Sequence, residues 1–205
     1  MATNPEQQRM SFERYLLLVS NSERRYEYYD GEVGLMAGGS SNHATIALNF
    51  GVALDQALDN DAPCRPYVTN KLVRVTPTKT LIPDVVVSCD MADHGESQII
   101  DAPVLVVEAL SRSTEMTDLF VRLALYQAKE SIQEIIFISQ VIQRVEVFSR
   151  SATDWLYHQY GAGQSFHLRS LDIEIEVRQL YRRLLIPAVV EQVKEEGEDV
   201  PEPEQ

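Results

Sequence analysis

The sequence predicts a mixed α/β fold, in which helices pack on a mixed sheet. Three observations predict it: helical and strand periodicities alternate along the chain, several runs are rich in β-branched residues, and turn residues separate these segments. With 205 residues, 44% of them hydrophobic and 24% charged, the chain has the size and composition of one globular domain. We therefore expect a single domain over residues 1–190 and an acidic disordered tail over residues 191–205.

The first part of the chain is expected to form two helices with a hairpin between them. Ser11 is a typical helix N-cap, and apolar residues follow it at helical spacing. Asp30-Gly31 is a typical two-residue hairpin turn between strand-forming residues. Ser41 or Asn42 is expected to cap the second helix. The expected elements are a helix over residues 12–19, a hairpin over 25–35, a loop over 37–42 and a helix over 43–58.

The rest of the chain is expected to be mostly strands. The β-branched runs around Val85 and Val106 are typical of fully buried strands, whereas alternating polarity indicates a half-buried one. Residues 90–101 are expected to form a polar loop. Residues 171–184 fit either a helix or a strand. The expected elements are strands over residues 71–75, 84–89, 103–110, 134–139, 144–148 and 155–160, and a helix over 113–129.

The chain is acidic, with 18 basic and 31 acidic side chains and a net charge of −13. The tail over residues 191–205 contributes −6 of this charge, which leaves −7 for the rest of the chain. An acidic body does not attract a phosphate backbone at long range. Composition therefore argues against nucleic-acid binding, unless a metal ion and a few local cations offset the charge of a cleft.

Export and membrane insertion are not expected. The N-terminus lacks the basic start and apolar stretch of a signal peptide, and no apolar run approaches the roughly 20 residues of a membrane span. We therefore expect a cytoplasmic protein without membrane contact. Cys64 and Cys89 have no metal-ligand spacing, so we expect unpaired thiols rather than a disulfide or a zinc site.

Two carboxylates at the ends of apolar strands are the first candidates for a functional site. Asp84 begins one expected buried strand and Glu108 lies near the end of the next. If these strands pair as antiparallel neighbours, both side chains lie at one edge of the sheet. Burying an unpaired carboxylate is costly, and Mg²⁺, or Mn²⁺ in its place, would compensate it with oxygen coordination. Alternatively, each acid simply ends its strand in solvent or pairs with a nearby arginine.

Asp84 and Glu108 belong to a series of short motifs that covers most of the chain, from about Ser11 to Leu184. The succession resembles the Uma-two-type restriction endonuclease family, formerly a domain of unknown function within the PD-(D/E)XK nuclease superfamily. No motif is decisive alone, but their order is specific. They are residues 26–32 (YEYYDGE), 36–43 (MAGGSSNH), 83–87 (PDVVV) and 107–111 (VEALS), followed by Ser113, Thr114 and Asp118.

The resemblance implies a restriction-endonuclease-like PD-(D/E)XK core with Asp84 and Glu108 as the ligands of Mg²⁺. The position two residues after Glu108 is Leu110 rather than the lysine of the motif name. In the family this lysine typically comes from the following helix, before an Ala-Leu-Tyr stretch, and the matching residue here is Arg122. Arginine stays charged, so it can anchor a phosphate or stabilise its charge but cannot exchange a proton with the attacking water as lysine can. The substitution therefore places catalytic competence in question.

Three further residues are candidates for the same site. Arg122 either contacts the scissile phosphate or forms an i, i+4 salt bridge with Asp118. His43 begins a helix and either accepts a proton at the site or is a satisfied core or capping histidine. Glu27 is favoured slightly over Glu32 as an acid that completes the metal cluster, although each is equally plausible on a strand surface.

Three functions remain open from the sequence. The first is a Mg²⁺-dependent DNA endonuclease that hydrolyses phosphodiester bonds, with Asp84, Glu108, Arg122, His43 and Glu27 as site residues and a homodimer as its assembly. The second is a catalytically degenerate nuclease fold that acts in binding or assembly. The third is hydrolysis of another phosphate ester. Four cations either line the cleft or lie on a solvated edge: Arg65, Lys71, Arg74 and Lys79.

Overall fold

The computed structural model describes residues 9–36, 38–68, 70–110 and 116–188. The expected acidic tail over residues 191–205 and the start of the helix expected at residue 113 lie outside these described residues. Within them, no helix has the length and apolar character needed to cross a membrane.

Short helices and many strands alternate along the chain, as the sequence predicts for a mixed α/β fold. The elements of the first half are α1 (Phe12–Ser20), β1 (Tyr26–Tyr29), β2 (Glu32–Leu35), α2 (Ser41–Ala57), β3 (Arg65–Val68), β4 (Leu72–Thr76), β5 (Lys79–Leu81), β6 (Val85–Ser88), η1 (Met91–Asp93) and β7 (Ile99–Ile100). Those of the second half are β8 (Pro103–Leu110), α3 (Met116–Ala128), β9 (Glu134–Ser139), β10 (Arg144–Arg150), β11 (Trp155–Gly161), β12 (Ser165–Leu168), β13 (Ile173–Glu176) and α4 (Val177–Leu180).

The larger sheet has six strands in the order β11-β10-β9-β8-β6-β3. β6 and β8 pair as antiparallel neighbours, as the sequence analysis required for a shared carboxylate edge. β8 and β9 are parallel, and α3 forms the crossover between them. The sheet is therefore mixed, with its fully buried strands at the centre.

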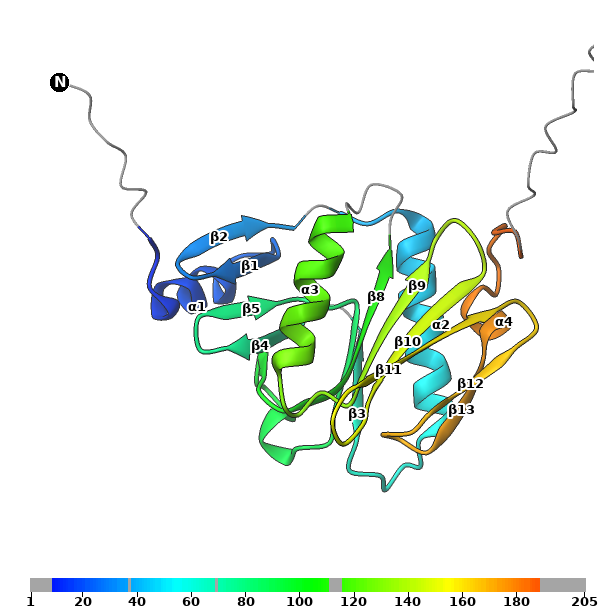
Figure 1. Ribbon diagram of the computed structural model, residues 1–205. Helices are drawn as coiled ribbons and strands as arrows, with labels where there is room; N and C mark the ends of the chain where they lie inside the picture. The colour runs from blue at the N-terminus through cyan, green and yellow to red at the C-terminus, as the bar shows by residue number, and fades with distance from the viewer. Residues whose placement is uncertain (1–8, 37, 69, 111–115, 189–205) are drawn as a thin grey trace, which may run out of the picture.

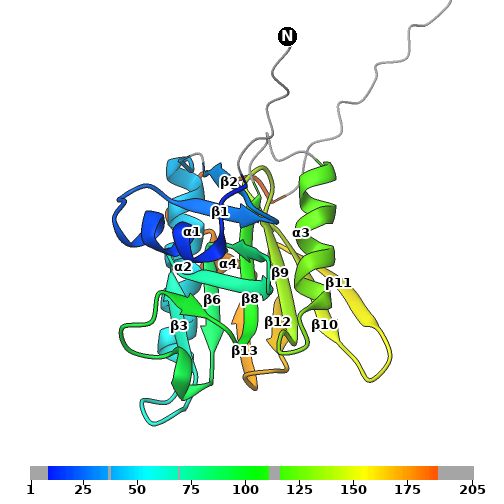
Figure 2. The same cartoon turned by 90° about the vertical axis from the view of Figure 1, so that its left-hand side faces the viewer.

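Helices α2 and α3 cover opposite faces of this sheet (Figure 1), and the view turned by 90° shows the sheet between them (Figure 2). Strand alternation explains the two layers. Val85 and Val107 pack with the apolar face of α2, whereas their neighbours Val86 and Val106 pack on the side of Tyr126 in α3. Each central strand is apolar on both faces because both faces are covered.

The smaller sheet has five strands in the order β2-β1-β5-β4-β7 and lies beside the first. α1 packs against it through Tyr15, whose ring stacks on Tyr28 with centroids 5.0 Å apart. Ser11 caps α1 by accepting from the Arg14 N–H at 3.4 Å, as predicted. The β1–β2 turn has positive φ at Asp30 and Gly31, which is the geometry that this pair of residues favours.

Three local expectations need correction. Ser40, rather than Ser41 or Asn42, caps α2, so the helix begins earlier than predicted. The segment 171–184 is neither one helix nor one strand, because β13 runs directly into the single turn α4. The loop expected over residues 90–101 contains η1 and β7, since Asp93 is buried and its carboxylate organises the turn around Asp101.

The two cysteines form a disulfide, so the expectation of unpaired thiols is wrong. The antiparallel register of β3 and β6 pairs Arg65 with Ser88, which places Cys64 and Cys89 opposite each other one step further. Sequence spacing says nothing about this register. The bond joins the edge strand β3 to β6, the strand that follows Asp84.

Replacement of both cysteines by serine should lower the free energy of unfolding by about 3 kcal/mol under oxidising conditions, because the bond closes a loop of 25 residues. The measurement is urea unfolding with and without dithiothreitol. Reductant should destabilise the native chain and leave the Cys64→Ser, Cys89→Ser variant unchanged. Identical curves for the native chain in both buffers would contradict the prediction.

Candidate active site

Asp84 and Glu108 meet at one edge of the larger sheet because β6 and β8 are antiparallel neighbours. The Asp84 N–H donates to the Val107 carbonyl at 3.0 Å, and the Ala109 N–H donates to Oδ2 of Asp84 at 2.8 Å. The Asp84 carboxylate therefore lies beside the backbone of the residue that follows Glu108. Both acids are buried, with exposed fractions of 5% and 9%.

Glu108 is held by two donors from α3. Oε1 accepts from Nε and Nη2 of Arg122 at 3.0 and 2.5 Å, and from the Tyr126 hydroxyl at 2.6 Å. Arg122 and Tyr126 are four residues apart and so lie on one face of the helix, toward the sheet. α3 thus fixes the orientation of the Glu108 carboxylate.

Arg122 also binds Glu27 of β1, which belongs to the smaller sheet. Its Nη1 donates to both carboxylate oxygens of Glu27 at 2.9 and 3.0 Å. Oε1 of Glu27 accepts in addition from the Ile82 N–H at 2.9 Å. A single buried guanidinium therefore bridges the two sheets, and all three of its nitrogens bond to protein atoms.

His43 approaches Asp84 from the first turn of α2, with its Nε2 2.5 Å from Oδ1 of Asp84. The Ser40 hydroxyl accepts from the backbone N–H of His43 and donates to Oε1 of Gln140. Nε2 of Gln140 lies 3.4 Å from Nδ1 of His43. Gly39 leaves room for the ring, because a Cβ there would lie 2.7 Å from Cγ of His43. The imidazole is thus held on both sides.

Burial and neighbouring charges shift the pKa of several groups in this cluster. Burial raises the pKa of the Glu108 carboxyl to about 7, and the charge of Asp84 adds to this, while Arg122 and Tyr126 act against it. The hydrogen bond to Asp84 raises the pKa of the His43 imidazole, although burial opposes this effect. Burial opposes the charged form of Arg122, but Glu108, Tyr126 and Glu27 together raise its pKa.

The donor set fits a hard divalent cation in its chemistry. Arg122 pairs with Glu27 and Glu108, and His43 pairs with Asp84. Three ionised carboxylates thus meet at most two positive charges, so negative charge is in excess. Within the described residues, no group of three or more His, Cys, Asp or Glu side chains is arranged to hold a metal ion. Mg²⁺ uses one or two carboxylates and completes its coordination with water and substrate phosphate, so Asp84 and Glu108 suffice as protein ligands.

The structure thus gathers Asp84, Glu108, Arg122, His43 and Glu27 in one network, whereas Glu32 is exposed on β2. The side chain of Asp118, the alternative partner of Arg122, lies outside the described part of the structure. The four cations that precede the Asp84 strand contact groups outside this network. Arg65 donates to the carbonyls of Ala62 and Cys64, and Lys71 donates to the carbonyl of Ser97. Arg74 pairs with the carboxylate of Asp101, and Lys79 pairs with the carboxylate of Asp30.

Two members of the network were not predicted from the sequence. Tyr126 entered the sequence analysis only as the tyrosine of the Ala-Leu-Tyr stretch that follows Arg122, and Gln140 was not singled out. Tyr126 could have been found from its spacing, because a residue four positions after Arg122 lies on the same face of a helix. Nothing in the local sequence marks Gln140, because its role depends on β9 ending beside β8.

Comparisons with known proteins show the family of this chain. The family profile described as "Uma2: Putative restriction endonuclease" matches residues 12–180. The "Uncharacterized protein slr1290" of Synechocystis is 30% identical over 178 residues, which are 86% of this chain and 93% of that protein. The "Uncharacterized protein sll1609" of Synechocystis is 24% identical over 140 residues, 66% of this chain and 78% of that protein.

The fold is also that of a solved structure, described as "a putative nuclease belonging to DUF820" from Anabaena variabilis. The TM-score is 0.64 at 16% identity, with 80% of this chain and 94% of that chain covered. A mixed sheet between helices, with the expected carboxylates at one edge, therefore defines a restriction-endonuclease-like fold. The chain belongs to the Uma2 family.

Replacement of Arg122 by methionine should destabilise the protein by about 3–5 kcal/mol, since it leaves the buried carboxylates of Glu27 and Glu108 without their cation. Urea unfolding measures this loss. Addition of Glu27→Gln and Glu108→Gln to the same variant should restore much of the stability.

Arg178→Met is the control, because Arg178 pairs with Glu176 at the exposed surface and its loss should leave the midpoint of unfolding unchanged. If Arg122→Met were no less stable than this control, the bridge between the sheets would not contribute to stability.

Proposed function

We propose that this protein is a Mg²⁺-dependent DNA endonuclease whose ion is held by Asp84 and Glu108. The observation that carries the proposal is the convergence of these two buried acids from paired strands, next to Glu27, Arg122 and His43. Membership of the Uma2 family supports the same reaction class. When bound, the ion would activate a water molecule and stabilise charge on the phosphate.

The surrounding residues are assigned distinct roles under this proposal. Arg122 is a positioning residue, because its nitrogens bond to Glu27 and Glu108 and it keeps its proton at any working pH. Tyr126 supports Glu108 from the same helix. His43 is assigned the exchange of protons at the site, and its contact with Asp84 holds it next to a proposed metal ligand.

A second function has one observation in its favour. Arg122 occupies the position at which the family resemblance places a lysine, and its donors are already used within the protein. A catalytically degenerate nuclease fold that binds metal and nucleic acid without cleavage is compatible with this arrangement. The experiment for the first function also separates the two.

Asp84→Asn with Glu108→Gln should abolish Mg²⁺ or Mn²⁺ binding in calorimetric titration and lower plasmid nicking by roughly 100-fold or more. Both substitutions preserve side-chain size, so the fold should remain. Asp154→Asn with Glu174→Gln changes the net charge equally at exposed positions and should leave both measurements unchanged.

The outcomes distinguish the functions. Metal-dependent nicking by the native chain and the control alone supports the endonuclease. Metal binding without nicking supports the degenerate fold. Failure of the native chain to bind either ion would rule out the metal site itself.

We also propose a homodimer that forms through β11. β11 is an edge of the larger sheet, seven residues long, and contains no charged side chain and no proline. The opposite edge, β3, is short, contains Pro66 and is joined to β6 through Cys64, all features that protect an edge.

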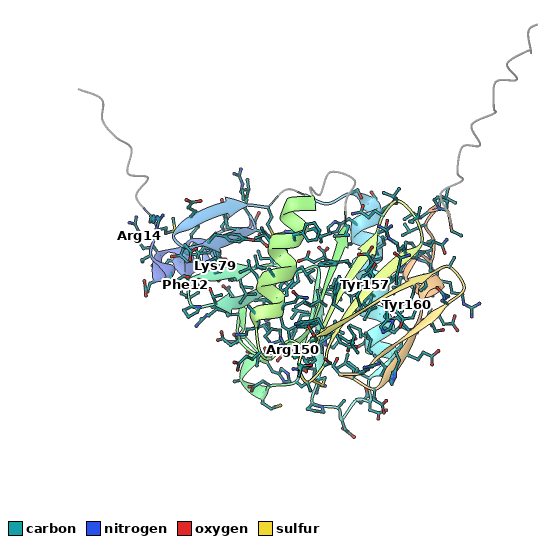
Figure 3. The ribbon with its side chains drawn as sticks, in the orientation of Figure 1. Phe12, Arg14, Lys79, Arg150, Tyr157 and Tyr160 are labelled. Atoms are coloured by element: carbon teal, nitrogen blue, oxygen red, sulfur yellow. A yellow bond between two sulfur atoms is a disulfide. The ribbon has the colours of Figure 1, made fainter. Side chains whose placement is uncertain are left out.

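Along β11, Tyr157 lies 5.0 Å from the ring of Phe148 on one face, and Tyr160 packs on Phe166 on the other; both tyrosines are labelled in Figure 3. Leu156 and Tyr157 are 38% and 50% exposed. In a chain with a net charge of −13, this uncharged strand is a surface that a second copy can approach without repulsion. Antiparallel pairing of two copies about His158 would set Leu156 opposite Tyr160.

Lysines on this strand should prevent the dimer, because they would place four uncompensated positive charges between the two paired strands. Light scattering after size-exclusion chromatography should give a dimeric mass for the native chain and a monomeric mass for Leu156→Lys, Tyr157→Lys. Leu17→Lys, Leu48→Lys, at exposed positions on α1 and α2, should remain dimeric. A monomeric native chain would contradict the proposal.

A further inference from the structure

A pocket of 230 Å³ lies beside the carboxylate network and includes none of its side chains. Its wall is formed by the end of α1, the segment that leads into β1, the start of β4 and Ile82. This volume is below the range of about 300–1,000 Å³ typical of cofactor-sized ligands. A small group, such as one phosphate, matches it better than a nucleotide cofactor does.

The pocket is cationic and polar, in contrast to the acidic chain around it. Arg24 and Arg25 line it together with Asn70 and Gln98, and Glu23 is the acid among its lining residues. Within the described part of the chain, neither arginine forms a salt bridge. Guanidinium and amide groups are the donors that proteins commonly use to bind phosphate oxygens.

The pocket and the carboxylate network share one wall. Ile82 lines the pocket, while its N–H donates to Oε1 of Glu27. Tyr26 lines the pocket and precedes Glu27 in β1. Arg25 is two residues before Glu27, which binds Arg122, so its backbone lies about 7 Å from that acid along the chain. One nucleic-acid strand can therefore reach both the pocket and the network.

We propose that this pocket binds a backbone phosphate of the nucleic acid, next to the phosphodiester positioned at Asp84 and Glu108. The inference rests on the proposed function, and it explains how a chain with a net charge of −13 holds a polyanion: its binding cations are concentrated beside the metal site. Because the contacts are to phosphate, the pocket orients the strand without selecting a sequence.

The first test compares two pairs of consecutive arginines. Arg24→Ala, Arg25→Ala removes the pocket cations, and Arg182→Ala, Arg183→Ala removes two exposed cations beside α4, which lies far from β1 (Figure 1). Binding of a fluorescent DNA duplex is measured by anisotropy in Ca²⁺, which replaces Mg²⁺ to avoid cleavage, at several NaCl concentrations. The pocket variant should bind at least about 10-fold more weakly than the control. The slope of its affinity against salt concentration should fall by about 0.9, the value for the loss of one phosphate contact.

Equal losses in the two variants would overturn the pocket as a phosphate site, even with nicking by the native chain intact. If the native chain neither bound nor nicked DNA, the proposed endonuclease would fail instead. The pocket is then judged with inorganic phosphate, followed through the arginine Nε–Hε signals in NMR spectra. Shifts that are present in the native chain and absent in Arg24→Ala, Arg25→Ala support phosphate binding, and an absence of shifts in the native chain overturns it.

Discussion

The buried guanidinium of Arg122 is the interaction on which the arrangement of the site depends. It binds Glu27 from the smaller sheet and Glu108 from the larger one, and no apolar side chain in its place could satisfy both acids. The bridge therefore ties β1 of the smaller sheet to the end of β8 in the larger one. The same contact that joins the sheets also orients a proposed metal ligand, so stability and site geometry cannot be altered separately at this residue.

Charge balance explains why the other groups gather around this bridge. With Arg122 neutralising one carboxylate, the remaining negative charge of Asp84 and Glu108 is confined in a largely buried volume, which is costly without a cation. His43 offsets part of it through Asp84. The proposed divalent ion would balance the rest, and the proposed phosphate pocket at Arg24 and Arg25 would complement it with donors for a polyanion.

Much of this fold and site followed from the sequence, for identifiable reasons. Asp84 precedes the β-branched run of one strand and Glu108 follows the apolar run of the next. Their meeting therefore required only antiparallel pairing of the two strands, which the structure has. The contact of Arg122 with Glu27 could not be derived, since residues 95 apart meet only through the packing of two sheets. The disulfide was missed for a related reason: cysteine spacing does not reveal strand register. The roles assigned to the site residues remain predictions.

The separation of the network's members along the chain also has a consequence for folding. Glu27 and Arg122 are 95 residues apart, and His43 and Asp84 are 41 apart. Contacts of this range form slowly, because distant segments must be brought together before any energy is gained. During synthesis, a ribosome-bound chain that lacks α3 would have Glu27 and Glu108 without their shared cation. The site can assemble only after α3 has emerged and docked, so a truncated product of translation would lack its geometry.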